Sequence, residues 1–104
     1  MTIIELAGIL SRVGIPVTYS HFREHKELPY ICYKETFTNN FKADDTVYKK
    51  GLYVDIEFYF EYKNLTLENQ IETLLEENSI VWDASEIYVE SDKVFQRTYE
   101  IKLI

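Results

Sequence analysis

Two helices are predicted by apolar residues that recur every three or four positions along the chain. In the first helix these positions are Ile3, Leu6, Ala7, Leu10 and Val13. Thr2 and Glu5 fit a capping box at its start, and Gly14 suits its end. The second helix begins at one of two candidate caps, Asn64 or Thr66. Its apolar stripe is Leu67, Ile71, Leu74 and Leu75.

Alternating apolar and polar residues predict strands over most of the remaining chain. The clearest strand covers residues 53–62, where Val54, Ile56, Phe58, Phe60 and Tyr62 share one face. Further strands are predicted at residues 17–22, 28–37 and 95–104, and one or two short strands at 80–82 and 86–90. Residues 38–46 are polar and predict a long hairpin loop or a flap between strands. The order α-β-β-β-α-β-β predicts a single α+β domain over residues 1–104, with both helices on one face of a mainly antiparallel sheet.

Charge and composition exclude several classes of function. Eleven basic residues stand against 18 acidic ones, a net charge of −7, and the densest basic site is only Lys49-Lys50. Binding to nucleic-acid phosphates or to an anionic membrane is therefore disfavoured. The single cysteine, Cys32, excludes an internal disulfide framework. Without a basic leader or a long apolar run, we expect a soluble protein made in a reducing cytoplasm.

Three short motifs were candidates for chemistry, and none is convincing. Residues 21–25, His-Phe-Arg-Glu-His, match the H-x-x-E-H pattern of inverted zinc peptidases. That pattern needs a helix, which Pro29 leaves no room for, so a solvated loop is expected. Cys32 has no neighbouring base, and Asp44-Asp45 lack the ligand alternation of a calcium loop. We expect no catalytic residue, no metal and no cofactor, and an enzyme built on the histidine pair is the least favoured hypothesis.

Two groups of acidic residues can be interpreted either as ordinary solvated faces or as functional surfaces. One face of the clearest strand carries Asp55, Glu57 and Glu61, with Tyr53 and Tyr59 between them. This face predicts a partner interface or a plain solvated face, with an acid–base pair among the three carboxylates less favoured. On the second helix the outer stripe is Glu68, Glu72 and Glu76. Like charges one turn apart cost a few tenths of a kcal/mol per pair, about 0.2–0.5. The stripe is therefore either an ordinary solvated face or a surface that must repel something negative.

Several stretches, taken in order, resemble a known family. They are residues 28–33, 39–44, 47–48, 53–59, 88–92 and 99–101. Together they resemble the small tail-completion or tail-terminator proteins of long-tailed phages and prophages of Gram-positive bacteria, and the resemblance covers nearly the full chain. The family's Asn-Asn-Phe-x-Ala-Asp stretch corresponds to Asn39, Asn40, Phe41, Ala43 and Asp44.

The resemblance implies a structural protein and not an enzyme. Such proteins form a six-membered ring that caps the tail tube, ends tube growth and joins the tail to the head. The implied partners are further copies of the chain, the major tail tube protein and the head-completion or connector protein. Genomic DNA would pass through without specific binding, and no membrane is involved. The protein would be assembled in the cytoplasm of the bacterial host and would end at the head-proximal end of the tail in the virion.

A ring closed by one repeated contact uses two different faces of each subunit. The candidates are the strand face of Tyr53, Asp55 and Tyr59 and the segment that holds Asn39, Asn40, Phe41, Asp44 and Tyr48. For the ring lumen the candidates are Glu68, Glu72 and Glu76, because a negative lumen would repel passing DNA. The competing hypothesis is a small acidic DNA mimic that inhibits a nucleic-acid-processing enzyme, which the net charge also suits.

Overall fold

A computed structural model describes the backbone of residues 1–43 and 46–104, and the side chains of residues 1–36 and 51–104. Its elements follow the predicted order. They are α1 (Ile3–Ser11), β1 (Val17–Tyr19), β2 (Tyr30–Ala43), β3 (Thr46–Phe60), α2 (Leu65–Glu77), β4 (Trp82–Val89) and β5 (Val94–Leu103). The α+β class and the order α-β-β-β-α-β-β are confirmed. Neither helix of the described chain is long and apolar enough to cross a membrane.

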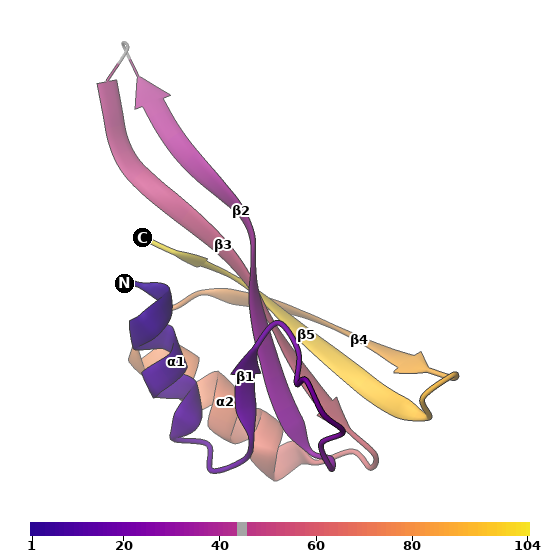
Figure 1. The fold of residues 1–104 in the computed structure, drawn as a ribbon. Coiled ribbons are helices and arrows are strands. Elements are labelled where there is room, and N and C mark those ends of the chain that lie inside the picture. Colours follow the sequence, from indigo (N-terminus) through magenta and orange to yellow (C-terminus); the bar gives the residue numbers. More distant parts are fainter. Residues whose placement is uncertain (44–45) are drawn as a thin grey trace.

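The five strands form one sheet in the order β1-β2-β3-β5-β4 (Figure 1). β1 pairs with β2 in parallel, and the other neighbouring pairs are antiparallel. β3 and β4 therefore run in the same direction with β5 between them, and α2 makes the crossover that joins them. This places β4 at one edge of the sheet and the three-residue β1 at the other.

Both helices cover the same face of the sheet and build one core with it. The alternation predicted for β3 is confirmed, since Val54, Ile56, Phe58 and Phe60 are at most 1% exposed. They pack with Leu6 and Leu10 of α1, Ile71 and Leu75 of α2, and Tyr99, Ile101 and Leu103 of β5. The prediction is wrong for Tyr62, which is 78% exposed. β3 ends at Phe60, so Tyr62 lies in the bend before α2 and no longer follows the pleat.

Of the two alternatives predicted for residues 38–46, the long hairpin loop is wrong for the described residues, because both flanking strands continue through the segment, and the flap between strands is the one that agrees with it. β2 and β3 pair from Tyr30↔Tyr59 as far as Ala43↔Thr46. β5 accompanies β3 only as far as Leu52↔Leu103. Beyond that point the hairpin projects from the body as a two-stranded ribbon (Figure 1). We call residues 39–43 and 46–51 the arm.

The helix caps follow the sequence closely. At α1, Thr2 Oγ1 accepts a hydrogen bond from the Glu5 amide at 3.1 Å, and Glu5 Oε1 accepts from the Thr2 amide at 3.0 Å. At α2 the sequence left two candidates, and the cap is Asn64, whose Oδ1 accepts from the Leu67 amide at 3.0 Å. Thr66 lies exposed in the first turn.

Substitution of the two α2 candidates should therefore give unequal results. Asn64→Ala removes the acceptor for a helix-end amide and should lower the unfolding free energy by about 1 kcal/mol. Thr66→Ala, the matched control, should change it by less than about 0.5 kcal/mol. Chemical denaturation of the two variants measures the difference, and equal losses would contradict the assignment of the cap.

Candidate interaction surfaces

The arm holds most of the predicted interface residues of the 38–48 region. Asn39, Asn40 and Phe41 lie in β2, and Tyr48 lies in β3. Asp44 falls outside the described residues. In the described part of the chain no third strand pairs with the arm. Because an isolated two-stranded ribbon is only marginally stable in water, the arm is well placed to be completed by a partner.

The face of the sheet opposite the helices carries Tyr53, Asp55 and Tyr59, as the alternation predicted. It is less open than expected, because the neighbouring Glu57 is only 7% exposed. Tyr59 Oη donates to Glu57 Oε1 at 3.2 Å, and Gln96 Nε2 donates to Glu57 Oε2 at 3.1 Å. Burial and the adjacent carboxylate raise the pKa of Tyr59. Tyr53 and Asp55 remain half-exposed.

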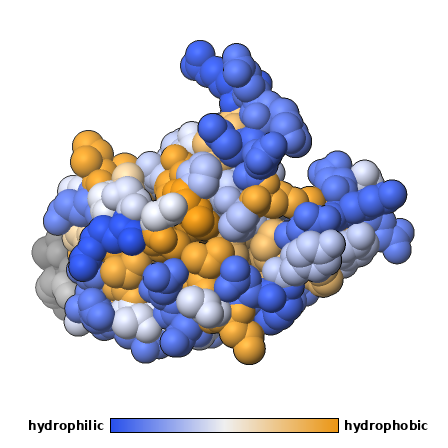
Figure 2. All heavy atoms as spheres, turned by 90° about the horizontal axis from the view of Figure 1, so that it is seen from below, coloured by the Kyte–Doolittle hydropathy of each residue, from blue (hydrophilic) through white to orange (hydrophobic). Residues whose placement is uncertain are grey.

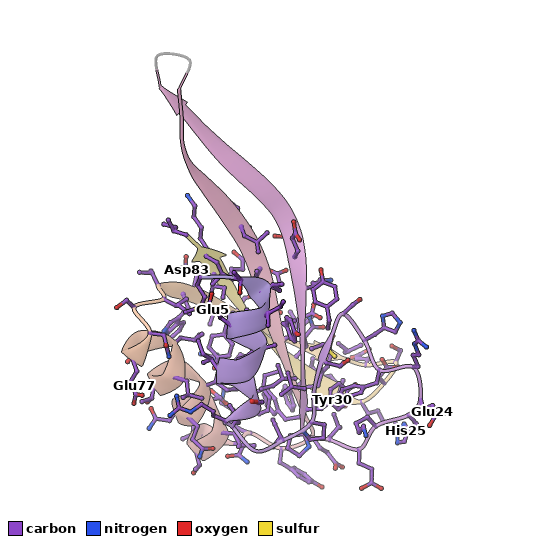
Figure 3. All side chains as sticks on the ribbon, turned by 60° about the vertical axis from the view of Figure 1, so that its left-hand side comes forward. Glu5, Glu24, His25, Tyr30, Glu77 and Asp83 are labelled. Atoms are coloured by element: carbon purple, nitrogen blue, oxygen red, sulfur yellow. The ribbon has the colours of Figure 1, made fainter. Side chains whose placement is uncertain are left out.

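The segment between β1 and β2 lies over this face and encloses a pocket of about 520 Å³. Its lining includes His21, His25, Tyr30, Cys32 and Tyr59. The two histidines are exposed, and Figure 3 shows His25 at the outer rim of the segment. Among the described residues no three potential ligands are grouped to hold a metal ion. Residues 21–25 lie outside the helices and strands, and all but Phe22 are exposed, which confirms the prediction of a solvated loop.

Cys32 forms the floor of the pocket and is 3% exposed. Burial, and to a smaller extent the charge of Glu57, raises the pKa of the thiol from 9.0 to about 11. The thiol is thus protonated at neutral pH and is a poor nucleophile. Cys32 is therefore a small, free and buried thiol.

The raised thiol pKa predicts a loss of stability in alkaline solution. Between about pH 9 and 11 the unfolded chain loses the Cys32 proton while the folded chain keeps it, so rising pH favours unfolding. The slope from this group is at most about 1.4 kcal/mol per pH unit. Tyrosines whose pKa is raised in the fold add to the decline in both proteins, so Cys32→Ala should flatten the decline between pH 9 and 10 without abolishing it. Denaturation curves over this range measure it, and an unchanged slope in the variant would contradict the assignment.

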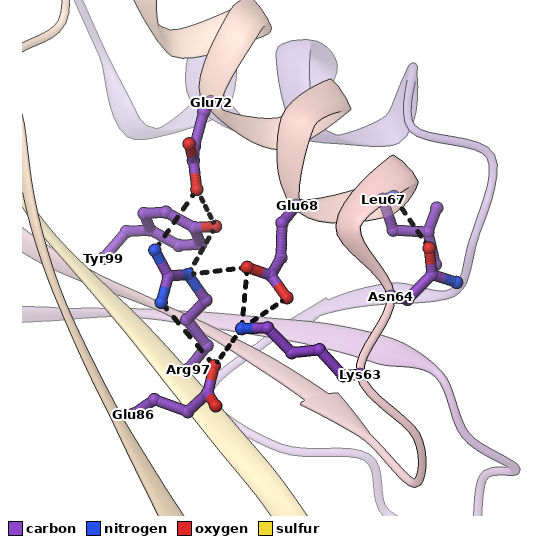
Figure 4. A network of polar contacts seen from close by, with 8 residues as sticks. All are labelled: Lys63, Asn64, Leu67, Glu68, Glu72, Glu86, Arg97 and Tyr99. Atoms are coloured by element: carbon purple, nitrogen blue, oxygen red, sulfur yellow. Dashed lines mark hydrogen bonds and ion pairs between the residues drawn. The ribbon is translucent and has the colours of Figure 1, made fainter.

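On the helix face, Arg97 of β5 lies at the centre of an ionic cluster (Figure 4). Its guanidinium is 3.4 Å from Glu68 and 3.3 Å from Glu72, both on α2, and 3.6 Å from Glu86 on β4. Arg97 Nε also donates to Tyr99 Oη at 3.0 Å, and Tyr99 Oη donates to Glu72 at 2.8 Å. The cluster thus ties α2 to two strands.

Lys63, just before α2, adds a second cation to this cluster. Its ammonium lies 2.8 Å from Glu68 and 2.8 Å from Glu86. Hydrogen bonds to these two carboxylates raise the pKa of Lys63. Three carboxylates therefore share two cations, and most of their charge is neutralised within the fold.

The predicted outer stripe on α2 is wrong for two of its three members. Glu68 is 5% exposed and Glu72 is partly buried, and both face the sheet; only Glu76 is exposed. The cause is Arg97, which occupies an inward position of β5 and needs carboxylates beside it when removed from water. A surface that repels DNA requires exposed charge, so Glu68 and Glu72 no longer qualify as lumen residues.

Comparisons with known proteins assign none of these surfaces. No protein-family model matches the chain. A search of curated proteins finds no match either.

Proposed function

We propose that this chain is a subunit of the tail-terminator ring of a long-tailed phage, which caps the tail tube, ends its growth and provides the docking face for the head connector. The observation that carries the proposal is the arm. A fold that extends two strands beyond its own sheet leaves their outer edges to be completed by something else, and a repeated subunit is the simplest candidate. The sequence resemblance to tail-terminator proteins points the same way.

The placement of exposed surfaces supports assembly through two different faces. The arm projects from the β2–β3 side of the sheet, whereas β4 forms the far edge. Large apolar side chains are also exposed at the end of the sheet away from the arm, among them Tyr62, Leu65 and Ile87. Figure 2 shows apolar patches that interrupt the hydrophilic surface at the lower end of the molecule. Contacts between unlike faces generate closed rings when the rotation permits.

The charge distribution favours the ring over an acidic inhibitor. A DNA mimic presents carboxylates in place of phosphates, yet Glu68, Glu72 and Glu86 are held by Arg97 and Lys63. The remaining net negative charge still disfavours phosphate binding, which suits a channel that DNA must pass. Glu76 is the one member of the original set that remains a lumen candidate.

The copy number of the chain in purified virions tests this proposal. A terminator ring predicts a small fixed number of copies per particle, about one ring, beside a much larger number of tube subunits. Quantitative mass spectrometry of gradient-purified particles of the phage that carries the gene measures this ratio. Absence from the particles would overturn the proposal and favour an inhibitor that acts inside the infected cell.

A further inference from the structure

We infer that the arm of one copy pairs with the outer edge of β4 in a second copy, so that the sheets of neighbouring subunits join. This deepens the proposed function, because it names the contact that would close the ring. β4 pairs with β5 along its whole length, from Trp82↔Ile101 to Val89↔Val94. No strand of the described chain lies on its other side. Residues 83–88 are all exposed.

The β4 edge lacks most of the features that keep edge strands apart. Such edges are commonly protected by proline, lysine, a bulge or a covering element. The eight residues of β4 include no proline and no basic residue, and their pairing with β5 runs without a register shift. Ile87 and Tyr88 are 57% and 49% exposed on it. The opposite edge of the sheet, β1, offers only three residues.

Charge identifies the arm as the occupant of this edge. Residues 37–51 carry three lysines against two aspartates, whereas the other residues carry 8 basic against 16 acidic side chains. The stretch 82–93, which is β4 and the following turn, holds four acidic residues against Lys93, and one of the four, Glu86, is already paired with Lys63 and Arg97. Asp83, Glu90 and Asp92 are exposed there. The net positive ribbon and the net negative edge are complementary, and such complementarity sets register and partner choice.

The arm cannot pair with the free edge of β4 in its own chain. Its strands are continuous with β2 and β3, and β5 separates β3 from β4 in the sheet. The arm also extends away from the body (Figure 1). The partner edge must therefore belong to another copy, and the resulting contact joins two different faces, as ring closure requires.

Engineered disulfides test the contact directly. In a Cys32→Ala background, Ser85→Cys at the centre of β4 is combined with a cysteine at arm position 47, 48 or 49, so that register does not decide the result. Oxidation should convert at least one of these variants into a ladder of covalent multimers on non-reducing gels. The matched control keeps the arm cysteine but moves the other cysteine from β4 to β1, with Thr18→Cys in place of Ser85→Cys. This control should stay monomeric. Cross-linking through β1 instead, or no cross-linking with the chain monomeric at about 1 mM, would overturn the inference.

Charge exchange supplies an independent measurement. Lys49→Glu with Lys50→Glu should raise the dissociation constant between copies at least about tenfold, and adding Asp83→Lys with Glu90→Lys should restore it. Arg23→Glu with Lys26→Glu makes the same change of charge in the loop and should have little effect. Circular dichroism verifies that each variant folds, and failure of the compensating pair would count against the contact. If the chain forms arm–β4 multimers but is absent from virions, the terminator role is contradicted and the contact stands. If the chain is present in virions but does not form this cross-link, the contact is contradicted and the terminator role stands.

Discussion

Arg97→Met should be the most destabilising exchange outside the apolar core, with a loss of about 3 kcal/mol in unfolding free energy. Glu68 and Glu72 are packed against Arg97 with little exposure to water, so removing the cation leaves two poorly solvated carboxylates close together. Methionine keeps much of the side-chain volume, so the loss reports charge and not a cavity. Urea denaturation near pH 7 measures it.

The matched control is Arg23→Met, which makes the same exchange at an exposed loop position. It should change the unfolding free energy by less than about 0.5 kcal/mol. Combining Arg97→Met with Glu68→Leu and Glu72→Leu should recover much of the loss, because apolar groups then replace Glu72, which has lost its cation, and Glu68, which keeps only Lys63. An Arg97→Met variant as stable as the Arg23→Met control would show that the cluster does not hold α2 to the sheet.

Shortening the arm should abolish infectivity while leaving the fold intact. Replacing residues 40–50 by Asn-Gly joins Asn39 to Gly51, which are paired in the hairpin, through a two-residue turn of the favoured type. The buried core that the structure describes, which includes Leu6, Phe58 and Tyr99, lies in the body of the domain, so the thermal unfolding temperature should change by only a few degrees. If the arm makes the ring contact, the variant should fail to complement a deletion of the gene.

Two measurements are needed to test the effect of shortening the arm, one of infectivity and one of folding. Plaque titres from the complemented deletion should fall to the level of the uncomplemented strain, and calorimetry should find a cooperative unfolding transition in the purified variant. A folded variant that restores full titre would exclude an essential role for the arm. A variant that does not unfold cooperatively would show that the domain needs the arm for its stability.

The parts of the fold that local physics determines were predictable. The capping box at Thr2 and Glu5, the helical stripe of α2 and the alternation in β3 each leave a pattern within a few residues, and the structure confirms them. The arm left no such pattern, because residues 38–46 are mostly polar and do not alternate between apolar and polar positions. Its polar composition instead suggested a loop.

The ionic cluster could not be predicted from the sequence of α2 alone or of β5 alone. Glu68 and Glu72 share one face of α2, and only the docking of that face against β5 buries them. One signal was present: Arg97 interrupts the inward series of Phe95, Tyr99 and Ile101. An arginine in such a position demands carboxylates from another element, and α2 was the nearest acidic helix.

The most direct test of the terminator role is the length of tails made without this protein. Lysates of the phage deleted for the gene are stained negatively, and tail lengths are measured beside those of the complemented strain. If the protein is the tail terminator, we expect full heads separate from tails whose lengths are uneven or excessive. Detached tails of normal length would move the protein to the head side of the joint, and intact normal virions would contradict a structural role altogether.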